Sequence, residues 1–317
     1  MSKLIKLTLT VLALFVICGC GGNTGSSISD TRDMLSRADG EFKPDEVITY
    51  KHVDGVELAL DVFYPHENSK AQNRAAIVTF FGGGWNMGGA GQFYRQSRYW
   101  ADRGMVAICA DYRVRSRHNV TPDKCLEDAK SAMRWVRSHS KELGIDPDRI
   151  AAAGGSAGGH LAAATAMVKG FDAPGDDLTV SPAANALVLF NPVIDNGPEG
   201  YGYDRVKDYW QKFSPFHNID GNAPPAVFFL GTEDHLIPVD TAWRFKNRIE
   251  SKGGRCDLFI YQGQGHGFFN YEKSRRHFFQ TLLESDRFLE SIGYLRGRPL
   301  IEEQQAVSLL KSKSSNP

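Results

Sequence analysis

Residues 149–159 read Arg-Ile-Ala-Ala-Ala-Gly-Gly-Ser-Ala-Gly-Gly. The apolar run predicts a buried strand over 149–153, and the alanine-rich segment behind Ser156 predicts a helix over 157–169. A Gly-x-Ser-x-Gly pattern at such a junction is typical of a sharp strand-to-helix turn that raises a serine hydroxyl above the edge of a sheet. Glycine is needed on both sides of the serine because larger side chains would collide with the neighbouring strand and helix.

The alternation of strand and helix patterns continues over most of the chain. Further strands are predicted at 76–81, 106–111, 185–191, 226–230 and 257–261, and further helices at 92–103, 122–142, 239–252 and 274–292. Two earlier runs, 47–50 and 56–64, flank Asp54-Gly55, which is a strong signal for a tight hairpin. This order predicts an α/β fold with a mostly parallel central sheet, helices on both faces and an antiparallel N-terminal hairpin.

Two polar loops follow successive predicted strands downstream of the serine. One strand leads into Glu233 and Asp234, and the next leads into His266. The carboxyl ends of parallel strands meet at one edge of a sheet, so these side chains are expected close to Ser156. A serine nucleophile needs a base for its proton and an acid to orient that base. We therefore predict Ser156, His266 and Asp234 in these roles, and Glu233 is the alternative acid, although we expect it to point away from the histidine.

A glycine-rich loop lies upstream, at Gly82, Gly83 and Gly84, directly after the predicted strand 76–81. Backbone N–H groups in such a loop can point at the oxygen that becomes negative when a carbonyl group is attacked. The N–H of the residue after the nucleophile joins them in sites of this kind. We therefore predict Gly83, Gly84 and Ala157 as oxyanion donors.

Four segments together resemble the hormone-sensitive-lipase-like branch of the α/β-hydrolase esterases: Gly82–Trp85, Asp111–Arg113, Gly144–Ile150 and Gly154–Gly158. Within that branch the chain is similar to bacterial esterases of the acetyl-xylan and feruloyl esterase type, over about residues 45–293. The resemblance implies the α/β-hydrolase fold and a carboxylic ester hydrolase with Ser156, Asp234 and His266 as its catalytic triad. One position departs from it. The branch usually has a histidine before the glycines, where this chain has Phe81, so the contacts that histidine makes to brace the loop are lost.

The termini are predicted to lie outside the folded domain. Residues 1–19 combine two lysines with a short apolar run and precede Cys20, which is typical of a bacterial lipoprotein signal that ends at a lipidated cysteine. An ordinary cleaved signal is the alternative. The predicted division is then a flexible tether over 20–44, a hydrolase domain over 45–295 and a disordered tail over 296–317. We expect a protein of the bacterial cell envelope, lipid-anchored with the outer membrane preferred, or a secreted one.

The interval 191–223 interrupts the alternation and is rich in aromatic residues. We predict that Tyr201, Tyr203 and Trp210 form a substrate wall beside the active edge, together with Trp85 from the glycine-rich loop. Aromatic faces suit a sugar ring or an aromatic acyl group. The alternative is that these aromatic side chains only pack the segment onto the sheet.

Charge and cysteine content limit the expected partners. Lys+Arg and Asp+Glu number 37 each, so no basic surplus argues for a nucleic acid partner. Cys109, Cys125 and Cys256 show no spacing typical of metal ligands, and we predict no disulfide among them. Acyl transfer by a serine needs neither a metal nor an organic cofactor, and none is expected.

These observations predict an acyl-enzyme hydrolase that deacetylates polysaccharides or oligosaccharides. The alternatives are a general carboxylesterase or lipase, a peptidase of the prolyl-oligopeptidase kind and a non-catalytic binding protein on the same scaffold. The peptidase is disfavoured because the Gly82–Trp85 loop is of the esterase type. The binding protein is disfavoured because such proteins usually lose a triad residue, and all three are present here.

Overall fold

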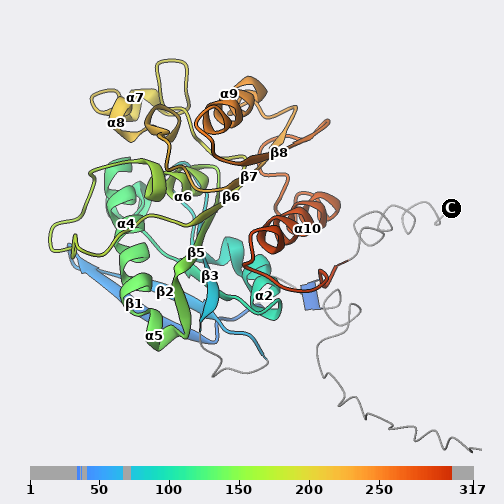
Figure 1. Ribbon diagram of the computed structural model, residues 1–317. Coiled ribbons are helices and arrows are strands. Elements are labelled where there is room, and N and C mark those ends of the chain that lie inside the picture. Colours follow the sequence, from blue (N-terminus) through green and yellow to red (C-terminus); the bar gives the residue numbers. More distant parts are fainter. Residues whose placement is uncertain (1–33, 36, 38–40, 67–72, 302–317) are drawn as a thin grey trace, which may run out of the picture.

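An eight-stranded sheet runs through the centre of the computed structural model, which describes residues 34–35, 37, 41–66 and 73–301 (Figure 1). Its strand order is β1-β2-β4-β3-β5-β6-β7-β8. The strands are β1 (Glu46–Val53), β2 (Val56–Phe63), β3 (Arg74–Phe80), β4 (Val106–Ala110), β5 (Ile145–Gly155), β6 (Ala186–Phe190), β7 (Ala226–Gly231) and β8 (Cys256–Tyr261). β2 pairs antiparallel with β1 and β4, and the other neighbouring pairs are parallel. The predicted fold class is confirmed.

The predicted hairpin between β1 and β2 is present. Its two turn residues, Asp54 and Gly55, have φ values of 50° and 75°. Positive φ at both central positions is the requirement of the tight hairpin turn whose twist matches that of the strands. The hairpin therefore adds two antiparallel strands to the edge of the parallel sheet.

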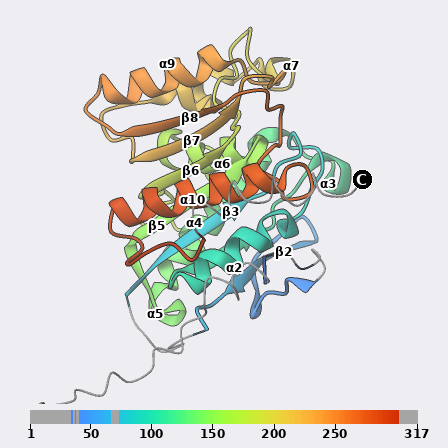
Figure 2. The same cartoon turned by 90° about the vertical axis from the view of Figure 1, so that its right-hand side faces the viewer.

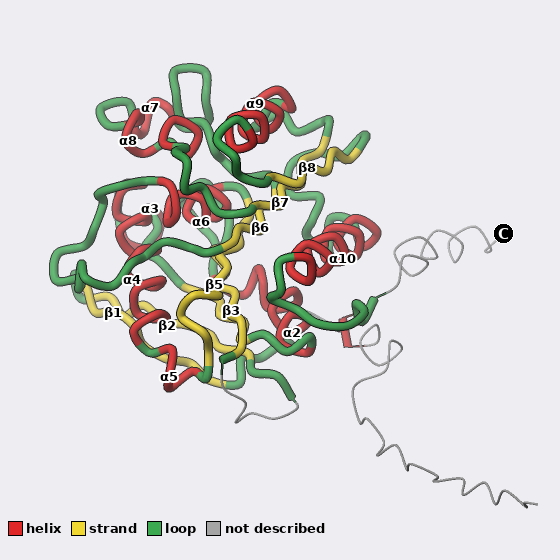
Figure 3. Tube along the Cα trace, in the orientation of Figure 1, coloured by secondary structure: helices red, strands yellow, loops and turns green. Residues whose placement is uncertain are grey.

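Helices cover both faces of the sheet. The longer ones are α2 (Tyr94–Asp102), α4 (Pro122–Ser138), α6 (Ala157–Met167), α9 (Val239–Glu250) and α10 (Arg275–Ser291). The shorter ones are η2 (Ala90–Phe93), α3 (Arg115–His118), α5 (Ser140–Leu143), α7 (Tyr203–Val206), α8 (Trp210–Phe213) and η3 (Pro215–Asn218). Figures 1 and 2 show α2 and α10 on one face and α4, α6 and α9 on the other. The connection between β6 and β7 is mostly loop, interrupted by the short helices α7, α8 and η3 (Figure 3).

The core lies in two layers, one on each side of the sheet. Val78 and Ile108 pack in the layer that includes α4, α6 and α9 residues, while their neighbours Ile77 and Ala107 pack in the layer with α2 and α10 residues. Successive strand residues point to opposite faces, so strands covered on both sides must be apolar throughout. All five residues of β4 and all five of β6 are buried, as this arrangement requires.

Several predicted elements differ from the structure at their ends, and two of them differ most. The helix expected over 122–142 is interrupted at His139, whose ring stacks on Trp135 with the centroids 3.9 Å apart, and α5 follows as a separate turn. β5 begins at Ile145, four residues before the predicted start. Its pairing with β3 shifts register between Arg74 and Ala76, which accommodates the extra polar residues as a bulge.

The described parts of the predicted tether and tail contain packed residues. Leu35, Phe42 and Ile301 are all buried, and the Arg95 guanidinium lies 4.7 Å from the centre of the Phe42 ring while donating to the carbonyl oxygen of Leu35. Leu35 and Ile301 belong to the core layer that holds α2 and α10 residues, so these described parts are packed and differ from the flexible tether and disordered tail that we expected. The predicted signal and Cys20 lie outside the described residues.

Within the described part of the chain, none of the helices has both the length and the apolar character needed to cross a membrane.

Candidate active site

The serine turn has the geometry that its glycines predict. Ser156 joins β5 to α6 with φ of 55° and ψ of −120°, a strained conformation for a residue with a side chain. Its N–H donates to the carbonyl oxygen of Phe190 over 3.0 Å. A Cβ on Gly158 would lie 2.0 Å from the carbonyl oxygen of Phe80, and one on Gly154 would lie 2.3 Å from that of Gly158. Only glycine allows the strand and helix to approach this closely.

The structure brings Ser156, His266 and Asp234 together. His266 Nε2 lies 2.9 Å from Ser156 Oγ, and His266 Nδ1 lies 2.8 Å from Asp234 Oδ2. The Asp234 side chain is fully buried, whereas the His266 side chain is 23% exposed. The buried carboxylate holds the proton of the imidazole on Nδ1, which leaves Nε2 free to accept the proton of the serine hydroxyl. Glu233 is exposed and takes no part in this arrangement.

The loop after β7 holds the Asp234 carboxylate in place. Asp234 Oδ1 accepts from the N–H groups of Leu236 and Ile237, over 2.9 and 3.0 Å. The other carboxylate oxygen, Oδ2, faces His266. These bonds engage both carboxylate oxygens, so the side chain is held in the position from which it orients the imidazole ring.

Asn191 is a site residue that the sequence reasoning did not identify. It is buried at the end of β6 with φ of 34°, and its Oδ1 accepts from the N–H of Gly267 over 3.0 Å. Its Nδ2 lies 3.4 Å from His266 Nε2. Asn191 therefore holds the histidine loop against the sheet. Its place at the carboxyl end of the strand next to the serine strand was a signal that could have found it.

The predicted oxyanion loop follows β3 directly. Gly83 and Gly84 have φ values of 123° and 65°, and a Cβ on Gly83 would lie 2.1 Å from the carbonyl oxygen of Met87. The Gly83 carbonyl oxygen closes a turn by accepting from the N–H groups of Asn86 and Met87. No described residue accepts a hydrogen bond from the N–H of Gly83 or Gly84. Ala157 begins α6, where the first N–H groups have no partner within the helix.

Side chains from two distant segments brace this loop. The Gly82 N–H donates to Gln92 Oε1 over 2.6 Å, and Gln92 Nε2 donates to Asn270 Oδ1 over 3.0 Å. Asn270 Nδ2 in turn donates to the carbonyl oxygen of Gly267 over 2.8 Å, next to the active histidine. On the other side, Arg205 Nη1 donates to the carbonyl oxygen of Gly84 over 2.6 Å. Nothing in the sequence pattern indicated these contacts.

Phe81 occupies the position where the resembling esterases usually have histidine. Its ring stacks on Tyr112 with the centroids 4.0 Å apart, and the Tyr112 hydroxyl donates to the Phe81 carbonyl oxygen over 2.6 Å. Phe81 is only 1% exposed, so the ring belongs to the core. The polar side chains that contact the glycine-rich loop are instead those of Gln92 and Arg205.

A cavity of about 710 Å³ opens in front of Ser156 and His266. Trp85 and Tyr201 line it, but Trp85 is only 1% exposed and is largely a core residue. Tyr203 and Trp210 are absent from the lining and face one another, with ring centroids 6.3 Å apart. The structure thus places two of the four predicted wall residues at the cavity and packs the other two within the β6–β7 connection.

His160 follows the nucleophile by one turn of α6 and is fully buried. Its ring centroid lies 5.1 Å from that of Trp85 and 4.2 Å from that of Phe213. Its Nε2 lies 3.1 Å from the Phe213 carbonyl oxygen, and its Nδ1 has no partner among the described residues. Burial lowers the pKa of His160 to about 3. His160 is therefore a neutral packing residue at pH 7, and His266 alone faces the serine.

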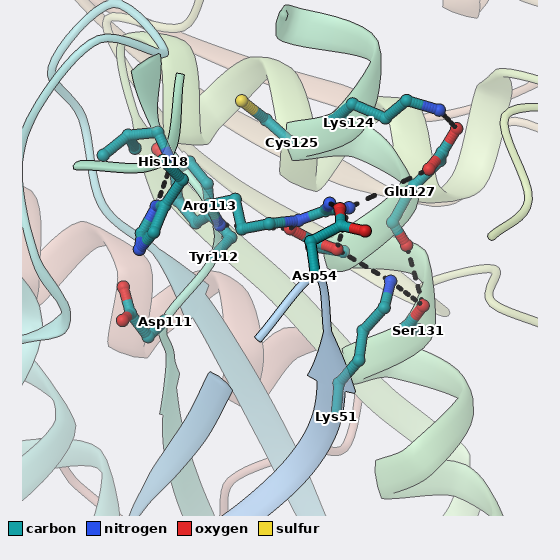
Figure 4. A network of polar contacts seen from close by, with 12 residues as sticks. Lys51, Asp54, Asp111, Tyr112, Arg113, His118, Lys124, Cys125, Glu127 and Ser131 are labelled. Carbon is teal, nitrogen blue, oxygen red and sulfur yellow. Dashed lines mark hydrogen bonds and ion pairs between the residues drawn. The ribbon is translucent and has the colours of Figure 1, made fainter. Parts of the chain in front are cut away.

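A polar network behind the site joins the hairpin to α4 (Figure 4). Arg113 contacts both carboxylate oxygens of the buried Asp128, through Nε at 2.8 Å and Nη2 at 2.9 Å, and reaches Asp54 in the hairpin turn. Lys51 adds a second cation on Asp128 at 2.7 Å. Asp111 pairs instead with Arg117. This network ties the segment after β4 to α4 and to the hairpin turn, and the charged side chains named here are all paired with one another.

Comparison with known proteins agrees with this geometry. Residues 60–198 match the BD-FAE family model, and residues 198–290 match the dienelactone hydrolase family model. A thermophilic esterase from the planctomycete Thermogutta terrifontis, solved with propionate bound, is 45% identical with a TM-score of 0.78. The match covers 81% of this chain and 98% of that one. The chain belongs to the α/β-hydrolase esterases.

Curated relatives of this esterase chain are more distant. The probable carboxylic ester hydrolase LipM of Mycobacterium tuberculosis is 29% identical, over 72% of this chain and 56% of its own length. The acetylxylan esterase of Xylanibacter ruminicola is 27% identical, over 61% of this chain and 41% of its own length. The chain spans about half the length of the first curated relatives it matches. The Thermogutta esterase has also been solved phosphorylated by paraoxon.

Proposed function

We propose that this esterase chain is a serine carboxylic ester hydrolase that works through an acyl-enzyme. One observation carries the proposal: His266 bridges Ser156 and the buried Asp234 with contacts of 2.9 and 2.8 Å at the wall of an open cavity. A hydroxyl within hydrogen-bond reach of a base, itself oriented by a third group, is the arrangement of an activated nucleophile.

The first half of the reaction forms the acyl-enzyme. His266 Nε2 accepts the proton of Ser156 Oγ as the oxygen attacks the ester carbonyl carbon, and the carbonyl oxygen becomes negative. The N–H groups of Gly83, Gly84 and Ala157 are the donors proposed for this oxygen. The tetrahedral carbon then expels the alcohol, whose oxygen takes the proton from His266, and Asp234 stabilises the imidazolium meanwhile.

The second half repeats these steps with water. His266 removes a proton from water, the resulting hydroxide attacks the acyl carbon, and Ser156 Oγ leaves with the proton returned by the imidazolium. The products are the free acid and the regenerated enzyme. The loop that carries Gly83 and Gly84 is held by its own turn and by the contacts of Gln92 and Arg205, so these donors stabilise the negative oxygen without reorganising during the reaction.

The substrate class proposed is an acetylated polysaccharide or oligosaccharide. The acetylxylan esterase among the relatives supports this class, as does the aromatic side chain of Tyr201 in the cavity lining. A general carboxylesterase is the second candidate, supported by the 29% identity to the carboxylesterase NlhH of Mycobacterium tuberculosis.

The N-terminal pattern supports a lipid anchor at Cys20 and a place in the bacterial envelope. Cys20→Ser should then release the protein from membranes of the expressing bacterium into the soluble fraction. Membrane association unchanged by this substitution would refute the anchor.

Hydrolysis by the full chain in mild detergent tests the activity. The substrates are p-nitrophenyl acetate, butyrate and octanoate beside acetylated xylan, with Ser156→Ala as the test variant. Removing the nucleophile should lower kcat by roughly 10⁶. Ser138→Ala, at an exposed serine on α4, is the matched control and should retain full activity.

The outcomes separate the candidates. Acetate turnover and acetyl release from xylan that both depend on Ser156 would support the saccharide esterase. Preference for octanoate with no release from xylan would favour the general carboxylesterase. Turnover that Ser156→Ala leaves intact, together with failure of a fluorophosphonate probe to label Ser156, would overturn the mechanism.

A further inference from the structure

The charged side chains that line the cavity are all cationic. They are Arg115, Arg205 and Lys273, and none of the described lining residues is an aspartate or glutamate. The whole chain has 37 basic and 37 acidic residues, so this excess is local. A concave site lined by one sign of charge focuses its potential and concentrates molecules of the opposite sign.

Arg205 is the innermost of the three cations. Its guanidinium lies 5.0 Å from the Trp85 ring centre and 5.1 Å from that of Tyr201, and Nη1 donates to the Gly84 carbonyl oxygen. It is half-buried, yet it forms no ion pair with a described carboxylate. A guanidinium carries five N–H donors, so the bond to Gly84 leaves most of them available.

The surrounding backbone makes room for this guanidinium. Gly202 has φ of 77°, and a Cβ at that position would lie 2.9 Å from Arg205 Nη2. A partly desolvated cation without a counter-charge is unfavourable unless polar or anionic groups compensate it. The site therefore holds a charge that its own residues do not neutralise.

The Tyr201 hydroxyl stands beside the same loop. A Cβ on Gly84 would lie 2.9 Å from Tyr201 Oη, which places the hydroxyl next to the Cα of the residue whose N–H is one of the proposed oxyanion donors. The described residues offer it no hydrogen-bond partner. The hydroxyl and the guanidinium are thus two donors that flank the place where an ester would bind.

Arg115 and Lys273 are exposed and come from other segments. Arg115 begins α3, and its side chain makes no contact with a described carboxylate. Lys273 follows the histidine loop and donates from Nζ to the His266 carbonyl oxygen over 3.1 Å. The three cations therefore approach the cavity from three different segments of the chain.

We infer that the cavity takes esters that also carry a carboxylate, which Arg205 and the Tyr201 hydroxyl bind directly and Arg115 and Lys273 attract. The inference rests on the proposed esterase function and narrows its substrate class. The carboxylate has two possible sources: the acid part, as in a monoester of a dicarboxylic acid, or the alcohol part, as in an acetylated uronate saccharide. Guanidinium and hydroxyl donors match a carboxylate in either case.

Paired substrates with the same carbon skeleton test the inference. The acyl pair is p-nitrophenyl hydrogen glutarate against p-nitrophenyl valerate, and the alcohol pair is acetylated methyl glucuronide against acetylated methyl glucoside. The measured quantity is the ratio of kcat/KM for the anionic ester to that for the neutral ester. We expect a ratio of at least about ten for one pair, since a hydrogen bond to a charged group contributes a factor of roughly 10–100. The pair that shows this ratio identifies whether the carboxylate belongs to the acid part or to the alcohol part of the ester.

Variants separate charge recognition from bracing of the loop. Arg205→Gln should lower the ratio about 10–100-fold, while any loosening of the Gly84 contact lowers both rates together and leaves the ratio unchanged. Arg205→Lys should retain part of the preference. Arg117→Gln is the matched control, because Arg117 pairs with Asp111 and does not line the cavity. Its ratio should equal that of the wild type.

Binding to the inactive protein gives a second readout that does not depend on turnover. Calorimetric titration of Ser156→Ala with glutarate and with glucuronate should show binding that Arg205→Gln weakens at least tenfold. Ratios near one for both pairs, or a ratio unchanged by Arg205→Gln, would overturn the inference. Ser156-dependent hydrolysis of the neutral esters would then still stand, so the two proposals fail separately.

Discussion

Gln92 is expected to control the rate of hydrolysis without touching the substrate's reacting atoms. Its amide links the Gly82 N–H to Asn270, and Asn270 contacts the loop that carries His266. The glycine loop and the histidine loop are thus held in one arrangement. Gln92→Met keeps nearly the same volume and removes both hydrogen bonds of the side chain.

The expected magnitude follows from these two bonds. A neutral hydrogen bond contributes about 0.5–1.5 kcal/mol, so both together amount to about 1–3 kcal/mol. Where the loop position matters only in the transition state, that loss appears in kcat as a factor of roughly 5–150. Complete loss of one oxyanion donor costs about 10²–10³, which is the upper limit for a loop that is only loosened. We expect kcat about ten- to a hundredfold lower and KM within about threefold of the wild type.

The assay is steady-state hydrolysis of p-nitrophenyl acetate at saturating substrate, with the unfolding transition measured on the same samples. Gln211→Met, at an exposed glutamine on α8, is the control and should match the wild type. Asn270→Leu should repeat the effect, and the double variant with Gln92→Met should lose less than the product of the two factors, because both side chains act in one chain of contacts. Wild-type kcat in a folded Gln92→Met protein would refute the reasoning.

Three further predictions concern single residues. Asp234→Asn should lower kcat by about 10⁴ with KM little changed and an unaltered circular dichroism spectrum, and a loss below tenfold would contradict its role. Gly158→Ala should prevent stable folding or lower the free energy of unfolding by more than about 4 kcal/mol, because its Cβ would meet the Phe80 carbonyl oxygen at 2.0 Å. Gly221→Ala, with nothing within 4 Å of the new Cβ, should be nearly neutral by urea titration. The pKa of His160, lowered by burial from 6.5 to about 3, means that the unfolded chain binds this proton first as the pH falls. The share of the free energy of unfolding that depends on neutral His160 should therefore be fully present above about pH 6.5 and should fall by up to about 4–5 kcal/mol as the pH approaches 3. His160→Gln should remove this part of the pH dependence in urea titrations between pH 7 and 3.

Much of the fold could be predicted from local patterns. The hairpin at Asp54-Gly55, the order of strands and helices and the turn at Ser156 all appear where residue spacing and glycine sterics placed them. The errors lie at element ends. His139 ends α4 through its stacking on Trp135, and polar residues enter β5 as a bulge. The periodicity of hydrophobic residues predicts neither the stacking contact nor the bulge.

The candidate site, too, could be predicted only in part. Ser156, Asp234 and His266 were predictable because each follows a strand, and the carboxyl ends of parallel strands converge at one edge. Asp234 and not Glu233 faces the histidine, and this too was expected. Gln92 and Asn270, 178 positions apart, were not predicted to meet, because no local pattern records a contact between two loops.

The sequence by itself determined the class of fold and the three residues at its active edge, since hydrophobic period, turn sterics and strand order are properties of neighbouring residues. Only the tertiary structure decided which side chains surround those three. It packed Tyr203 against Trp210 away from the cavity, buried Phe81 on Tyr112 and brought Arg205 beside Gly84. The direction of a side chain in a long connection depends on what the rest of the chain packs around it, and that packing exists only once the sheet has formed.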